Sequence, residues 1–142
     1  MSPNTCSNLM KLVAAIFGVY SILWSLAPFP DFNLPARFIL DISDWPLDNL
    51  TTPLDKNTKW LVSIASGLLA ALAIILAFIA APAIKNGDKK TQRIIIYALV
   101  SWYIIDGIGS IAADVFSNVI FNSIYLAIAL APLLLVRPVS SK

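Results

Sequence analysis

Four apolar stretches constrain the fold of this sequence more than any other feature. A helix needs about 20 predominantly apolar residues to cross the roughly 30 Å of hydrocarbon in a lipid bilayer. The four stretches approach this length and cover residues 12–29, 60–81, 94–113 and 116–136. In lipid the backbone polar groups must be paired within the chain, so each stretch is expected to be a helix. The sequence therefore predicts an all-α integral membrane protein, a four-helix transmembrane bundle in which residues 1–142 form a single domain.

Composition excludes several classes of function. Hydrophobic residues make up 58% of the 142 residues and charged residues 13%, which is more apolar side chain than a soluble domain of this size buries. The net charge of +2 is small and its basic residues form no aromatic-studded surface, so we expect no nucleic acid partner. The chain has no His, no Glu and one cysteine, Cys6. It thus lacks the usual ligands of haem, iron–sulfur clusters, zinc and copper, and we expect neither a metal site nor a cofactor.

The distribution of basic residues predicts the orientation of the chain in the membrane. The loop of residues 82–93 contains four basic residues against one acidic residue, namely Lys85, Lys89, Lys90 and Arg93. The loop of residues 30–59 contains five aspartates and three basic residues. Lys and Arg are enriched in cytoplasmic loops, so residues 82–93 are predicted to be cytoplasmic and residues 30–59 to lie outside. The N- and C-termini, near Lys11, Arg137 and Lys142, then also lie in the cytoplasm.

The outer loop is predicted to contain a short amphipathic helix. Its apolar residues recur at steps of four and three: Leu34, Phe38, Ile42 and Trp45. Asn33 and Pro35 are typical of a helix start, and Pro46 ends the pattern. We expect this helix to lie flat on the outer membrane surface and to cover the bundle. Three acidic residues are expected to form its solvated polar face: Asp41, Asp44 and Asp48.

The second span is predicted to begin beyond the lipid and to pack closely against a neighbour. Thr52 and Pro53 have the residue types of a helix cap and a first helical position, and the acidic Asp55 follows them near the positive end of the helix dipole. Within the span, small residues recur at steps of four and three: Ser66, Ala70, Ala73, Ala77 and Ala80. Such a stripe permits close approach of helix backbones in lipid and indicates a packing face.

Asp106 is the residue of the third span that most requires an explanation. Counting about 1.5 Å per residue from Arg93 places it about 20 Å from the inner boundary, deep in the hydrocarbon. A carboxylate at such depth costs about 2.5–3.5 kcal/mol on insertion scales, so it is expected to face the interior and to find a hydrogen-bond partner. Asp106 is therefore a functional candidate.

Neighbours of Asp106 can be predicted from helix geometry. The third and fourth spans form an antiparallel hairpin that turns near Val115, which brings Asn122 level with Asp106. Asn118 lies one turn nearer the outer surface, and Ser110 follows Asp106 at a four-residue step on the same helix. By depth, other polar residues fall in the same outer half. The predicted ligand-binding residues are Asp106, Ser110, Asn118, Asn122, Ser63, Ser66 and Trp24.

The polar residues are confined to the outer half of the predicted bundle. Residues 72–81 and 126–135 of the inner half are apolar apart from prolines. A conduction path is expected to have polar groups along its whole length, so this distribution favours a binding cavity open to the outside. Three interpretations of Asp106 remain: an interhelical clip that only sets helix register, a ligand site, and a group that moves a proton or an ion.

The sequence thus favours a non-enzymatic, small multi-pass membrane protein. It is predicted to contact the lipid bilayer and to bind a small amphipathic molecule or lipid in its outer half. A second interpretation is an accessory subunit that associates with another membrane protein or with a second copy of itself. The alternative from a different class is a small proton-coupled transporter that uses Asp106. No nucleophile with an adjacent base is visible, so no catalytic residue is predicted.

The format of the chain bears on its localisation. The chain is similar in format to many small bacterial inner-membrane proteins, with four spans, a first loop that covers the bundle and a basic cytoplasmic loop. The format also loosely resembles that of DoxX-like four-helix proteins, although no run of residues is specific to either group. We therefore expect the bacterial inner membrane as the location and take no function from the resemblance.

Overall fold

The computed structural model describes residues 1–137, so Lys142 lies outside the described residues. This part of the chain is helical and has no strand, which confirms the all-α prediction. Its helical elements are α1 (Pro3–Ser25), α2 (Leu34–Ser43), α3 (Lys56–Ile75), the π-helical turn η1 (Leu76–Ala80), α4 (Ala81–Lys85), α5 (Lys89–Ala112) and α6 (Phe116–Leu134). Elements α3, η1 and α4 form one continuous helix of residues 56–85. This helix and α1, α5 and α6 are long and apolar enough to cross a membrane.

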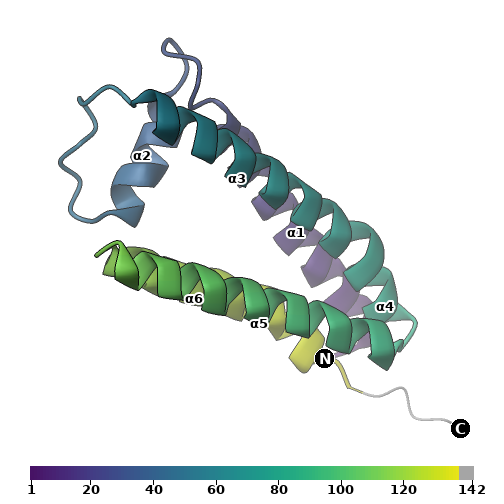
Figure 1. Ribbon diagram of the computed structural model, residues 1–142. Coiled ribbons are helices and arrows are strands. Elements are labelled where there is room, and N and C mark those ends of the chain that lie inside the picture. The colour runs from purple at the N-terminus through teal and green to yellow at the C-terminus, as the bar shows by residue number, and fades with distance from the viewer. Residues whose placement is uncertain (138–142) are drawn as a thin grey trace, which may run out of the picture.

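The long helices are arranged as two pairs (Figure 1). Helix α1 packs along α3, and α5 packs along α6. The pairs approach each other near α4 and diverge toward α2, which crosses the wide side between them. Helix α2 contacts both α1 and α6. We name the two ends of the molecule the α2 end and the α4 end.

The main apolar core lies toward the α4 end. Its largest fully buried side chains include Met10 from α1, Leu76 from η1, Ile84 from α4 and Leu99 from α5. The predicted small-residue stripe faces this contact, since Ser66, Ala73 and Ala80 are buried and the remaining two members are half-buried. Helices α1 and α3 pack against each other along this stripe, which confirms it as a packing face. Small side chains let the two backbones approach closely.

Pro82 accounts for the π-helical turn within the second long helix. Proline has no backbone N–H, and its ring clashes with the carbonyl four residues earlier in a regular helix. Just before it, the Ala81 N–H donates to the Leu76 carbonyl five residues back. This wider bonding pattern is that of a π turn. The helix therefore continues past the proline to Lys85 without ending.

The helices differ in extent from the apolar stretches. Three begin before the corresponding apolar stretch, at Pro3 rather than residue 12, at Lys56 rather than 60 and at Lys89 rather than 94. Each begins after a residue whose side chain caps it, namely Ser2, Asp55 and Asp88. The first turns of these helices contain polar residues, so the hydropathy pattern does not include them in the apolar stretches. The prediction that Thr52 and Pro53 begin the second helix is wrong, because Asp55 is the cap.

The two aspartate caps share one geometry. Asp55 accepts the Asn57 and Thr58 N–H groups at 2.7 and 3.0 Å, and the Thr58 hydroxyl donates to its other oxygen at 2.6 Å. Asp88 likewise accepts the N–H and the hydroxyl of Thr91 at 3.1 and 2.6 Å. The threonine hydroxyl is the largest cause that lowers the pKa of each carboxyl from its usual 3.8. Hydrogen bonds to the charged form favour it.

These caps predict that the first turns of α3 and α5 loosen in acid. A carboxyl whose pKa is lower in the folded protein stabilises it above the unfolded value of 3.8, and this contribution is lost as the pH falls below 3.8 through the folded value. Hydrogen exchange at Thr58 and Thr91, corrected for intrinsic rates, should show the loss of protection. Asp55→Asn keeps a capping oxygen without titrating, so its Thr58 protection should not change with pH over this range. Equal pH dependence in wild type and Asp55→Asn would contradict the prediction.

Helix α2 confirms the predicted helix in the first loop, but its faces differ from expectation. Its apolar stripe is exposed on the outside of the molecule, with Leu34 at 64% and Phe38 at 45% exposure. Ala36 is buried in the contact with α1, and Asp41 is only 3% exposed. Asp41 was predicted to be solvated, and this is wrong. The following loop folds over it, and one carboxylate oxygen accepts the backbone N–H groups of Asp48 and Asn49 at 3.2 and 3.0 Å.

Candidate functional site

The Asp106 side chain lies in a hydrogen-bonded network between α5 and α6. Its Oδ2 accepts the side-chain amide of Asn118 at 3.1 Å and that of Asn122. Asn118 also donates to the Ser110 hydroxyl at 2.8 Å. The hydrogen bond predicted between Asp106 and Asn122 is therefore present. Four of the seven predicted ligand-binding residues meet here, and we name Asp106, Ser110, Asn118 and Asn122 the Asp106 network.

The turn between α5 and α6 sets the register of this network. Asp114 follows the end of α5 with φ at 63°, in the left-handed region. The Asp114 N–H donates to the Ile111 carbonyl at 3.1 Å, and the Val115 N–H donates to the Ser110 carbonyl at 2.9 Å. This is the Schellman pattern, which ends a helix and reverses the chain within a few residues. Aspartate is among the few non-glycine residues that visit this backbone region.

The Asp106 network borders the face of α6 that meets α1. Asn122 is buried, and it shares a helix face with Tyr125 and Ala129 at steps of three and four. Tyr125 contacts two aromatic residues of α1, with ring centroids 6.1 Å from Phe17 and 5.6 Å from Tyr20. The network therefore lies about one helical turn from this aromatic contact, on its α2 side.

The other three predicted residues have separate interactions. Ser63 and Ser66 donate to carbonyls of their own helix, those of Lys59 and Ser63, each at 2.8 Å. Helix α3 packs against α1, and the Ser21 hydroxyl of α1 donates to the Ser66 carbonyl at 2.8 Å. Within residues 1–137, no hydrogen bond joins Ser63 or Ser66 to the Asp106 network. Both serines were predicted to join the Asp106 network, but their helix packs against α1.

Trp24 lies on the α1 side of the wide end. Its ring stands 5.5 Å from that of Tyr20, and it packs against a small apolar cluster of Ala27, Ala36 and Val62 that joins α1, α2 and α3. Its indole Nε1 is buried and has no hydrogen-bond partner in the described chain. A buried indole N–H usually finds an acceptor. Among residues 1–137 the Trp24 Nε1 has none.

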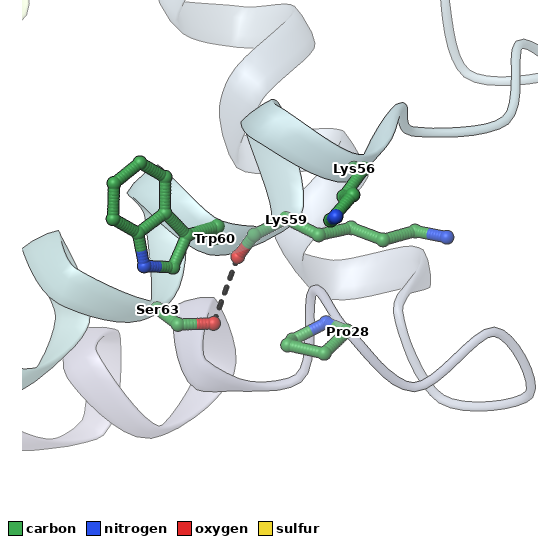
Figure 2. A pocket seen from close by; sticks show the side chains of 5 residues that line it. All are labelled: Pro28, Lys56, Lys59, Trp60 and Ser63. Atoms are coloured by element: carbon green, nitrogen blue, oxygen red, sulfur yellow. Dashed lines mark hydrogen bonds between the residues drawn. The ribbon is translucent and has the colours of Figure 1, made fainter.

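The α2 end also has an open pocket that the sequence did not indicate (Figure 2). It has a volume of about 460 Å³ and is lined by Pro28, Lys56, Lys59, Trp60 and Ser63. Ser63 is the only predicted ligand residue in this lining, and Asp106 is not part of it. The pocket forms because α1 packs along α3, which brings Pro28 beside the start of α3. That packing could not be read from hydropathy.

Helix α2 is fastened to α6 at one point. The Ser117 hydroxyl donates to the Ser43 carbonyl at 2.5 Å and accepts the Trp45 N–H at 3.2 Å. It thereby joins the end of α2 to the first turn of α6. The sequence analysis did not single out this contact, which joins Ser117 to the last residue of α2 and to the loop residue Trp45.

The arrangement suits binding better than covalent chemistry. The Asp106 network consists of a carboxyl, two amides and a hydroxyl, and it has no His, Cys or Lys as a strong base or nucleophile. In the described part of the chain, no three His, Cys, Asp or Glu side chains are grouped so that they could hold a metal ion.

Comparison with known proteins gives no relative. No family model, no curated protein and no solved structure matches this chain.

Proposed function

We propose that this chain is a non-enzymatic, multi-pass membrane protein that binds a lipid or a small amphipathic molecule at its α2 end. The ligand would lie between the α1–α3 and α5–α6 pairs, beside the Asp106 network. Four helices long and apolar enough to cross a bilayer support the membrane setting. Many large apolar side chains on their outer faces are exposed, such as Leu68, Phe78 and Ile105. Such faces are suited to contact with lipid tails.

The proposed orientation follows from the charges at the α4 end. Helix α4 ends at Lys85, and α5 begins with Lys89 and Lys90. These residues and the start of α1 lie at the α4 end. The positive-inside rule then puts the α4 end in the cytoplasm and the α2 end outside. In this setting the four long helices form a transmembrane bundle of a bacterial inner membrane, both termini are cytoplasmic, and α2 lies at the outer surface with Leu34 and Phe38 toward the lipid.

The observation that carries the proposal is the position of the Asp106 network. Asp106 is half-buried, and its partner Asn122 is on the α6 face toward α1, at the end where the helix pairs diverge. Small-molecule sites are mostly apolar with a few convergent polar groups. Here the aromatic rings of Tyr20, Trp24 and Tyr125 supply apolar surface, and the network supplies a carboxyl and amides that orient a polar group.

Native mass spectrometry of the full chain in mild detergent tests this proposal. The wild type should retain a lipid or a small molecule. In Asp106→Ala the retained fraction should fall about tenfold or more, since a hydrogen bond to a charged group contributes about 1.5–3 kcal/mol. Ile105→Ala is the matched control, because Ile105 precedes Asp106 but is 73% exposed on the outer face of α5.

Three outcomes would contradict the proposal. A wild-type chain that carries no small molecule would remove its basis. Equal retention in Asp106→Ala and wild type would show that the molecule binds elsewhere. A chain that retains only another protein would favour the accessory subunit in place of a ligand-binding protein. Circular dichroism and gel filtration of the Asp106→Ala variant establish that it is folded before its binding is compared.

A further inference from the structure

Arg37 of α2 is a half-buried cation at the α2 end and lies outside the Asp106 network. We infer that its guanidinium binds an oxyanion, the phosphate or carboxylate of an amphipathic ligand, held between α2 and the rest of the protein. This inference rests on the proposed function and adds the chemical class of the ligand's polar group. It is carried by unpartnered side-chain atoms of α1 and α2. The sequence singled out Trp24 among these residues but not Arg37.

One edge of the Arg37 guanidinium has no partner. Its Nε and Nη2 are both buried, and neither donates a hydrogen bond in the described chain. These two nitrogens form the side of the guanidinium whose N–H bonds point in the same direction. Such an edge donates two parallel hydrogen bonds to a pair of oxygens on one phosphate or carboxylate. The atoms without partners are thus the pair that recognises an oxyanion.

The nearest acid in the sequence does not take this role. Asp41 lies four residues after Arg37 on α2, a spacing at which opposite charges often pair. One Asp41 oxygen instead accepts the backbone N–H groups of Asp48 and Asn49. Its other oxygen, Oδ2, is buried without a partner and accepts no hydrogen bond from Arg37. The loop after α2 therefore holds one oxygen of the carboxylate. Within residues 1–137, neither Asp41 Oδ2 nor this edge of the guanidinium has a hydrogen-bond partner.

A second unpartnered donor lies on α1, which is in contact with α2. Trp24 packs against the cluster that contains Ala36, the residue before Arg37, and its Nε1 also lacks an acceptor. Within residues 1–137, three buried donor nitrogens of α1 and α2 thus lack partners, against one acceptor oxygen. Buried polar groups of a folded protein are nearly all hydrogen-bonded. A group rich in acceptor oxygens matches this excess of donors better than a cation or a neutral amine.

Access to Arg37 requires a movement of its side chain or of α2. Both nitrogens are shielded from solvent in this structure. Helix α2 rests on α1 through a cluster with the small buried residues Ala27 and Ala36, and the Ser117 hydroxyl joins its C-terminal end to α6. A headgroup that entered under α2 would meet Arg37 and Trp24, with its acyl chain toward the rings of Tyr20 and Tyr125.

Lipid titration followed by native mass spectrometry tests the inference. The delipidated full chain is titrated with phosphatidylglycerol, with phosphatidylcholine of the same acyl chains, and separately with inorganic phosphate. The wild type should prefer phosphatidylglycerol. Arg37→Gln should weaken this binding about tenfold or more, the effect of losing hydrogen bonds to a charged group. The affinity of Arg37→Lys for phosphatidylglycerol should lie between those of the wild type and Arg37→Gln. A lysine ammonium keeps the positive charge but cannot donate two parallel hydrogen bonds as the guanidinium does.

Lys56→Gln is the matched control for charge. Lys56 lies at the same end of the molecule, in the open pocket of Figure 2, and is exposed. Its replacement removes one positive charge without touching α2, so phosphatidylglycerol binding should change by no more than about twofold, as for a surface charge. An equal loss in Lys56→Gln and Arg37→Gln would overturn the inference, since binding would then follow net charge.

The remaining outcomes separate this inference from the proposed function. Lipid binding that falls in Asp106→Ala but is unchanged in Arg37→Gln would overturn the role of Arg37 and leave the proposed function standing. A wild type that retains nothing would overturn both. Inorganic phosphate that binds the wild type but not Arg37→Gln would support the oxyanion site with a free anion as its source, whereas phosphatidylglycerol binding alone would assign the source to a lipid headgroup.

Discussion

Leu76→Ala is expected to lower the free energy of unfolding by about 2 kcal/mol, near the lower limit for core leucines. Leu76 is fully buried in the π-helical turn, where it belongs to the core between α1 and the second long helix. In a soluble protein, this change loses two contributions to stability: the gain from removing the side chain from water and the van der Waals contacts around the cavity. In the proposed membrane setting, the leucine side chain would contact lipid tails and not water when the helices separate. Mainly the van der Waals contacts are therefore lost.

Phe78→Ala is the matched control for this prediction. Phe78 is two residues further along the same turn but is 75% exposed, so its removal should change the free energy of unfolding by no more than about 0.5 kcal/mol. Reversible unfolding in mixed micelles with increasing sodium dodecyl sulfate measures both variants. An equal loss in both would mean that Phe78 packs against protein and that the helix pairs are arranged differently around η1.

The long helices and the central polar contact could be predicted from the sequence. Hydropathy is sufficient to find four helices, because lipid-crossing length and apolar composition coincide in this chain. The contact of Asp106 with Asn122 follows from counting residues on either side of a tight turn, and the Schellman geometry at Asp114 keeps that count valid. The Asp106–Asn122 contact could therefore be predicted from the local geometry of two helices and the turn between them.

Contacts between helix pairs could not be predicted in the same way. Ser63 and Ser66 have the right depth for the Asp106 network, but α3 packs against α1, and this choice depends on side-chain packing along the whole stripe. Hydropathy also assigned Asp41 to solvent, because a carboxylate in a polar loop is usually hydrated. The loop after α2 covers Asp41 and donates two backbone N–H groups to its carboxylate. This carboxylate forms no hydrogen bond with Arg37.

The Asp106 network predicts a large difference between single and double variants. Asn122→Leu should lower the free energy of unfolding by about 1–2 kcal/mol, because Asp106 Oδ2 keeps only the Asn118 amide as a donor. This value lies between the 0.6 kcal/mol average for membrane interhelical hydrogen bonds and the roughly 1.5–3 kcal/mol of bonds to charged groups. The Asp106→Leu/Asn122→Leu double variant should recover most of the loss, since replacing both partners by apolar groups leaves no unpaired acceptor at this contact.

This pair of variants also distinguishes the interpretations of Asp106. If the network only clips α5 to α6, the stable double variant should retain every property of the wild type, including any bound molecule. If the network orients a ligand, the double variant should unfold like the wild type in sodium dodecyl sulfate but lose the molecule in native mass spectrometry. An Asn122→Leu variant as stable as the wild type would contradict the expected energetic role of the Asp106–Asn122 hydrogen bond, and selection for binding would then be the better explanation of a carboxyl at this depth.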